Sequence, residues 1–69
     1  MNLKEKLIEQ GIILVWLAER IGLSRPTLYK YLKRPDVFKV KHVRKICKYL
    51  DMTEREGMIN YFKQIDSYE

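Results

Sequence analysis

The strongest constraint on the fold lies in residues 20–34, RIGLSRPTLYKYLKR, where a helical pattern stops at a glycine and restarts a few residues later. Gly22 can adopt the positive φ that a tight turn requires. Ser24 is a natural N-cap for the next helix. Pro26 falls in the first turn of that helix, where its missing N–H group costs nothing. The stretch therefore predicts two short helices that meet across a turn of three or four residues.

The residues around this turn have the sizes that a close crossing of two helices requires. Ala18, Gly22 and Leu28 stand at relative positions 0, +4 and +10. The small Ala18 lets the second helix of the pair cross closely over the first. Leu23, Leu28 and Tyr31 are predicted to anchor the second helix inward, which leaves its other positions facing outward. This arrangement indicates a helix-turn-helix.

Helical spacing runs through the rest of the chain, and no strand-like alternation persists beyond a few residues. In the first helix, Leu3, Leu7 and Ile8 are expected to share the inward stripe. Thr53 and Glu56 are expected to form a capping box at the start of the last helix. The first two predicted helices cover residues 2–10 and 13–21, and the third runs from the Ser24 cap to Lys33. A loop, RPDVFK, follows. The fourth helix covers residues 40–50, and the fifth opens at TEREG.

The length of 69 residues predicts a single domain over residues 1–66, with residues 67–69 frayed. The expected fold class is all-α, a compact five-helix bundle. The lone Cys47 cannot form an internal disulfide and suits a reducing cytosol. The longest apolar run, IILVWLA, is far too short to span a bilayer, and the charged N-terminus does not resemble a signal peptide. The sequence therefore predicts a soluble intracellular domain.

Charge is concentrated in one part of the chain. Residues 25–48 contain nine Lys and Arg residues and one acid, Asp36, so this segment carries a net charge of +8. The rest of the chain carries −3, which gives the total of +5. A basic half beside an acidic half is typical of a nucleic-acid-binding protein. The alternative is a basic surface that is simply solvated.

Two stretches, WLAERIGLSRPTLYKYL and VKHVRKICKYLDMTEREGM, resemble the DNA-binding domains of the phage lambda repressor and Cro family. The resemblance covers roughly residues 3–62 and implies a five-helix fold whose third helix reads the major groove of double-stranded DNA. SRPTLYKYL alone also resembles recognition helices of site-specific recombinases and tetracycline-repressor-like regulators. The order of the five helices favours the lambda type.

The resemblance also implies which residues contact DNA. Arg25 is expected to read a guanine through its O6 and N7 atoms. Tyr29 is expected to stack on a sugar or pack on a thymine methyl group, and Lys30 to reach either a base or a phosphate. The base-contacting set is Ser24, Arg25, Pro26, Tyr29 and Lys30, and the phosphate-contacting set is Lys33, Arg34, Lys39 and Lys41.

The sequence departs from the family pattern in two places. The second helix opens with Ile13, Leu14, Val15 and Trp16, where the family has a polar cap and a phosphate-binding Gln. Val15 and Trp16 could therefore mark a partner surface; alternatively, Trp16 folds back on the first or fifth helix. In the loop, Arg34 stands where the family usually has glycine. The residues predicted for a dimer or partner interface are Val15, Trp16, Met58, Ile59, Tyr61, Phe62 and Ile65.

The leading prediction is a sequence-specific regulator of the phage or prophage repressor type, which occludes its operator as a homodimer in the cytoplasm, at the nucleoid. The alternatives are a protein-interaction module, such as an antirepressor or adaptor, and an amphipathic membrane-surface protein. His42 and Cys47 alone are too few ligands for a metal site, and Cys47 is expected to be a core residue. No catalytic motif is visible, so we expect no enzymatic activity, cofactor or small-molecule substrate.

Overall fold

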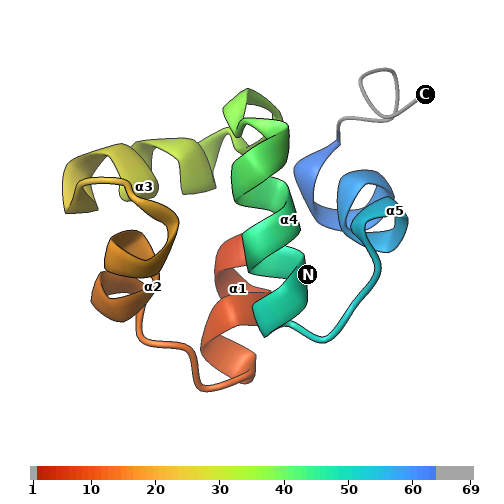
Figure 1. Cartoon of the computed structure of the whole chain (residues 1–69), viewed down its shortest axis with the longest axis horizontal. Coiled ribbons are helices and arrows are strands. Elements are labelled where there is room, and N and C mark those ends of the chain that lie inside the picture. Colours follow the sequence, from red (N-terminus) through yellow and green to blue (C-terminus); the bar gives the residue numbers. More distant parts are fainter. Residues whose placement is uncertain (1, 64–69) are drawn as a thin grey trace.

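The computed structural model describes residues 2–63 of the chain as a bundle of short helices (Figure 1). Within these residues every regular element is a helix, and all five predicted helices are present, which confirms the all-α five-helix fold class. The predicted fraying at residues 67–69 lies outside the described residues. The elements are α1 (Leu3–Glu9), α2 (Leu14–Ile21), α3 (Arg25–Lys33), the 3-10 helix η1 (Pro35–Val37), α4 (Val40–Tyr49), α5 (Glu54–Gly57) and the π-helical turn η2 (Met58–Phe62).

Three of the helices begin at side-chain caps that the sequence predicts. At α1, the Asn2 side chain accepts a hydrogen bond from the Glu5 amide at 2.8 Å, and the Glu5 carboxylate accepts one from the Asn2 amide at 3.0 Å. Ser24 caps α3. Thr53 caps α5, but the Glu56 carboxylate accepts from the Thr53 hydroxyl at 3.1 Å. The structure therefore has the predicted cap at Thr53 without the full capping box.

Three helices end in the same left-handed turn. Gly11 follows α1 with φ +75°, Gly22 follows α2 with φ +78°, and Asp51 follows α4 with φ +55°. In each case the amide of the next residue donates to the carbonyl five residues earlier, at 2.9–3.0 Å. The left-handed residue and this hydrogen bond together give carbonyl groups at the helix end a hydrogen-bond partner that the helix itself does not provide. The helices consequently end within a residue or so of the predicted positions.

Helix α4 runs through the middle of the molecule, with α2 and α3 on one side and α5 on the other (Figure 1). The core lies between them, where the apolar stripes of the helices meet in one cluster. The buried hydrophobic residues are Leu3, Leu7, Leu17, Ala18, Ile21, Leu28, Leu32, Phe38, Val43, Ile46, Cys47, Leu50, Met58 and Phe62. Cys47 is thus the core residue that the sequence predicts.

Phe38 holds the connection between α3 and α4 in place. Its ring is buried and makes edge-to-face contacts with Tyr31 of α3 at 5.2 Å and with Phe62 of η2 at 5.4 Å. Residues 35–37, predicted as loop, form the short helix η1, which Pro35 opens. This connection is therefore an ordered part of the bundle, fixed by aromatic packing.

The prediction for Ile8 was wrong. Its side chain is 58% exposed, whereas Leu3 and Leu7 are fully buried. Leu3 and Leu7 are four residues apart and lie on one side of a two-turn helix, while Ile8 is rotated about 100° from Leu7. A helix as short as α1 buries a narrow stripe, so Ile8 reaches solvent.

In the part of the chain that the structure describes, no helix has the length and apolar character needed to cross a bilayer.

Candidate nucleic-acid interface

The corner between α2 and α3 fixes the direction in which α3 leaves the turn. Gly22 supplies the positive φ, and the Leu23 amide donates to the Ala18 carbonyl at 2.9 Å. The Ser24 hydroxyl accepts from the Thr27 amide at 3.4 Å and donates to the Thr27 hydroxyl at 2.8 Å. These local hydrogen bonds stop one helix and start the next within three residues, as the sequence predicts.

Helix α3 has one buried side and one exposed side. Leu28 and Leu32 are buried four residues apart, and Tyr31 is half-buried against Phe38. The opposite side is exposed along the whole helix. All five residues predicted to contact bases lie on this side or at its N-cap, and all are exposed: Ser24, Arg25, Pro26, Tyr29 and Lys30.

The four residues predicted to contact phosphates are also exposed, and they continue from the end of α3 to the start of α4. Lys33 is the last residue of α3, Arg34 follows it, Lys39 is the N-cap of α4, and Lys41 lies in the first turn of α4. Arg34 donates to the Asp36 carboxylate at 3.3 Å. Because Phe38 packs into the core between these residues, the cations are held around a fixed connection.

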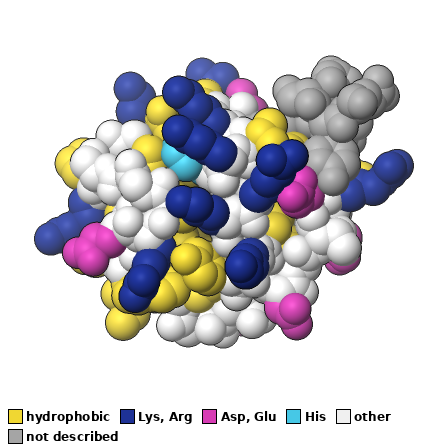
Figure 2. Space-filling view, viewed as in Figure 1, with side chains coloured by type: hydrophobic (Ala, Val, Ile, Leu, Met, Phe, Trp, Pro, Cys, Tyr) yellow, Lys and Arg dark blue, Asp and Glu magenta, His cyan; other side chains and the backbone are white. Residues whose placement is uncertain are grey.

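The remaining cations of the basic segment extend away from α3 along α4. Figure 2 shows Lys and Arg side chains both above α3 and over the visible face of α4. Arg44 pairs with Glu54 of α5, with 3.2 Å between its Nε atom and the carboxylate. Lys45 and Lys48 lie in the second half of α4, whose first turn adjoins η1. The cations of the +8 segment therefore extend from α3 over α4.

Trp16 packs on α4, a neighbour that neither sequence-based alternative named. Its ring makes an edge-to-face contact with Tyr49 at 5.1 Å, and the Arg20 guanidinium lies 5.1 Å from the ring centroid. Trp16 nevertheless remains 39% exposed, and Val15 and Ile13 are exposed beside it. Ile13 is the N-cap residue of α2, and its apolar side chain provides no hydrogen bond to the helix.

Part of the predicted interface set was wrong. Met58 and Phe62 are fully buried core residues on η2, which packs against η1. They cannot form a surface contact. Ile59 is 45% exposed, and Tyr61 is partly buried at the edge of the core. Ile65 lies outside the described residues.

His42 and Cys47 are both buried on α4. Burial, and then the charges of Lys41, Lys39 and Lys45, lowers the pKa of His42. Burial, and then Glu54 and Glu56, raises the pKa of the Cys47 thiol to about 11. Among the described residues no group of three or more metal-ligand side chains comes together.

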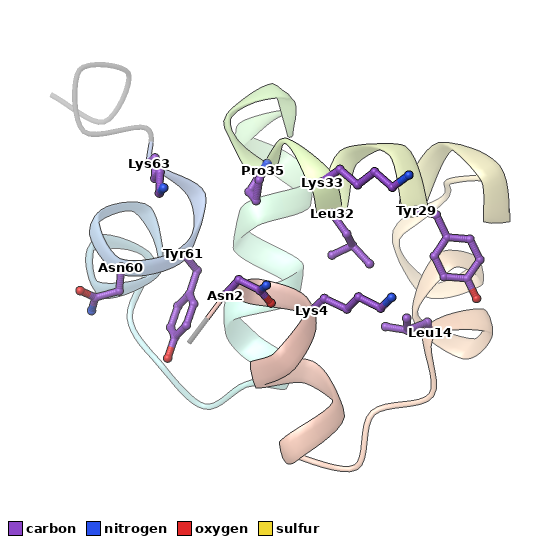
Figure 3. A pocket seen from close by; sticks show the side chains of 10 residues that line it. All are labelled: Asn2, Lys4, Leu14, Tyr29, Leu32, Lys33, Pro35, Asn60, Tyr61 and Lys63. Atoms are coloured by element: carbon purple, nitrogen blue, oxygen red, sulfur yellow. The ribbon is translucent and has the colours of Figure 1, made fainter.

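A groove of about 830 Å³ lies between the start of α1, the side of α3 and η2 (Figure 3). Lys4 and Lys63 line it together with Tyr29 and Lys33 of α3, a grouping that sequence reasoning missed. Lys63 lies at the η2 end of the groove, and Tyr29 lies at the opposite end. Lys4 and Lys63 are almost 60 positions apart in the sequence, and both lie outside the basic segment. No local pattern connects them, so the grouping depends on the tertiary packing.

The comparisons with known proteins agree with this geometry. A family model described as the Cro/C1-type helix-turn-helix DNA-binding domain matches residues 2–56, which include α1 to α4 and the first turn of α5. No curated protein and no solved structure gives a significant match. The matched range contains the α2–α3 corner and all nine exposed residues described above. Because the family model covers most of the chain, the protein belongs to the Cro/C1-type helix-turn-helix DNA-binding domain family.

Proposed function

We propose that the protein is a sequence-specific regulator that places α3 in the major groove of double-stranded DNA. The observation that carries this proposal is the two-sided character of α3. Leu28 and Leu32 hold the helix to the core, while Arg25, Tyr29 and Lys30 project from its free side. A helix held in this way can enter the groove without losing its packing.

The side chains at the start of α3 would read the bases. Arg25, in the first turn, has the planar fork that pairs with guanine O6 and N7. Tyr29 and Lys30 lie one turn further along, where Tyr29 can contact a sugar or a thymine methyl group and Lys30 a base or a phosphate. Ser24 and Pro26 can approach the bases closely because both are small and lie at the helix start.

The cations after α3 would hold the DNA backbone. Lys33, Lys39 and Lys41 carry charges that the described residues do not pair, and the packing of Phe38 supports their backbone. Arg34 already shares its charge with Asp36, so its contribution to phosphate binding should be smaller. Such contacts set the register of the protein on the duplex and add affinity that depends on salt.

We further propose a repressor of the phage or prophage type, in the cytoplasm and bound to chromosomal DNA. Occupying the major groove of an operator is sufficient to exclude other proteins from it. A homodimer would place two copies of α3 about one helical turn apart on a palindromic site. Ile59 and Tyr61 are the first candidates for the dimer contact, and Val15 with Trp16 is the second.

The exposed apolar residues at the start of α2 favour one alternative, a protein-interaction module that retains the fold. Ile13, Val15 and Trp16 all present apolar surface to solvent. Such a module should show little affinity for any duplex. A DNA-binding protein should instead lose affinity steeply as the salt concentration rises.

The test compares Arg25→Ala with Lys41→Ala on a site selected from a random pool of duplexes. We expect Arg25→Ala to weaken binding by about 1–3 kcal/mol on the selected site and to relax the preference at one base pair. Lys41→Ala should weaken binding equally on all sequences and reduce the salt slope by about one unit. Equal weakening by Arg25→Ala on every sequence would show that Arg25 contacts only phosphate and does not read a base.

A further inference from the structure

The groove beside α3 contains donors and cations from three separate elements. Lys4 lies on α1, Tyr29 and Lys33 lie on α3, and Lys63 directly follows η2 (Figure 3). In Figure 3 the Lys4 and Lys33 side chains extend toward Tyr29 from the two sides of the groove. The volume of about 830 Å³ is ample for a phosphate group and the sugar next to it.

The charge in this groove has one sign. Of the described residues that line it, three are lysines and none is acidic. The polar remainder consists of tyrosine hydroxyls and asparagine amides, which can donate hydrogen bonds to an anion. Asn2 uses its carbonyl oxygen to cap α1, which leaves its NH₂ group for a ligand. This set of groups matches a phosphate and repels a cation.

The groove is also next to the proposed DNA-reading surface. Tyr29 and Lys33 are one helical turn apart on α3, and they both line the groove and lie on the exposed side of the helix. The first residue of α2, Leu14, also lines the groove, and the N-cap before it, Ile13, provides no side-chain hydrogen bond. A DNA strand that passes α3 here therefore meets Lys4 of α1 and Lys63, the residue after η2, instead of a polar start of α2.

We propose that the groove between α1, α3 and η2 binds phosphate groups of the DNA backbone that flanks α3, with Lys4 and Lys63 as its additional cations. This inference rests on the proposed DNA binding by α3. It extends the phosphate contacts beyond residues 25–48 to both ends of the described chain. Free phosphate and pyrophosphate share this chemistry, so the test must separate them from DNA.

The test measures the salt dependence of binding for the full chain and its Lys4→Gln and Lys63→Gln variants, by fluorescence anisotropy on a duplex that extends beyond the bases under α3. Each variant should reduce the salt slope by about one unit, because one phosphate contact is lost. The control is Lys48→Gln, which removes the same charge from the second half of α4, outside the groove, and should retain the wild-type slope. All three substituted lysines are exposed, so thermal melting should confirm that the variants fold.

Equal slopes for the wild type, Lys4→Gln, Lys63→Gln and Lys48→Gln would overturn the groove assignment and leave DNA binding by α3 intact. A wild-type chain that binds no duplex even at low salt would overturn both proposals. A second arm titrates inorganic pyrophosphate and follows the melting temperature. Stabilisation by pyrophosphate that requires Lys4 and Lys63, together with unchanged DNA slopes, would show a small-anion site and so also overturn the assignment to DNA.

Discussion

At the scale of single residues, the most unusual environment belongs to His42. Its side chain is 6% exposed, its Nδ1 atom has no hydrogen-bond partner among the described residues, and its ring lies 6.4 Å from that of Phe38. Burial and the neighbouring lysines lower its pKa below the ordinary value of 6.5. The folded protein therefore holds His42 neutral at a pH where the unfolded chain already binds a proton.

This difference predicts how stability depends on pH. The unfolded state binds more protons than the folded state between the lowered pKa and 6.5. The stabilisation is therefore complete above about pH 6.5, and it is lost as the pH falls toward the pKa of the folded state. We expect the melting temperature to decrease over this range, and His42→Leu to flatten the decrease. His42 is the single histidine in the sequence, so NMR titration of the tag-free protein reads its pKa directly; a value at or above 6.5 would contradict the prediction.

At the scale of helices, α4 and α5 meet at a point that admits no extra atom. Gly57 has helical backbone angles, φ −62° and ψ −47°. At an ordinary helical position, replacing Gly by Ala stabilises a protein by about 0.5–1 kcal/mol. Here a Cβ atom would collide with the Cys47 Sγ atom. It would also lie 3.5 Å from the Phe62 ring and 3.6 Å from the Met52 sulfur. The helices can pack this closely because Gly57 has no side chain.

We therefore expect Gly57→Ala to lower the free energy of unfolding by about 1–3 kcal/mol, since overpacking forces the neighbouring groups apart. Urea denaturation measures this change. Removing the sulfur in the Cys47→Ala, Gly57→Ala double variant should recover most of the loss, which gives a favourable coupling energy between the two positions. Strictly additive effects would mean that the Cys47 sulfur is not the obstacle.

At the scale of the whole molecule, Ile59 and Ile8 form a matched pair. Both are isoleucines exposed to a similar degree, 45% and 58%, but Ile59 lies on η2 and Ile8 on α1. An exposed isoleucine contributes little to a monomer, and it contributes much more when a partner covers it. Substituting each by lysine therefore separates an interface from ordinary solvent-exposed surface.

If η2 forms the proposed dimer contact, Ile59→Lys should weaken binding to a palindromic duplex more than to a single half-site. Ile8→Lys should leave the ratio between the two duplexes at the wild-type value, and both variants should retain the wild-type melting temperature. Anisotropy titrations on the two duplexes and sedimentation equilibrium of the free protein provide the measurements. A wild-type ratio for Ile59→Lys would move the proposed contact to the surface of Val15 and Trp16.

The amino-acid sequence by itself determined the helices, their starts and ends, and the exposed side of α3. The Asn2, Ser24 and Thr53 caps and the turns at Gly11 and Gly22 involve groups no more than five residues apart, so their signals are local and readable in order along the chain. The residues expected to face DNA were exposed because the spacing of Leu28 and Leu32 fixes which side of α3 is buried.

Tertiary structure alone decided which surfaces meet. It placed Trp16 on Tyr49, buried Met58 and Phe62 instead of leaving them for a partner, paired Arg44 with Glu54, and brought Lys4 and Lys63 into one groove with α3. The physical reason is that an amphipathic pattern specifies which side of a helix is apolar, whereas the neighbour that covers it depends on how all the helices pack together.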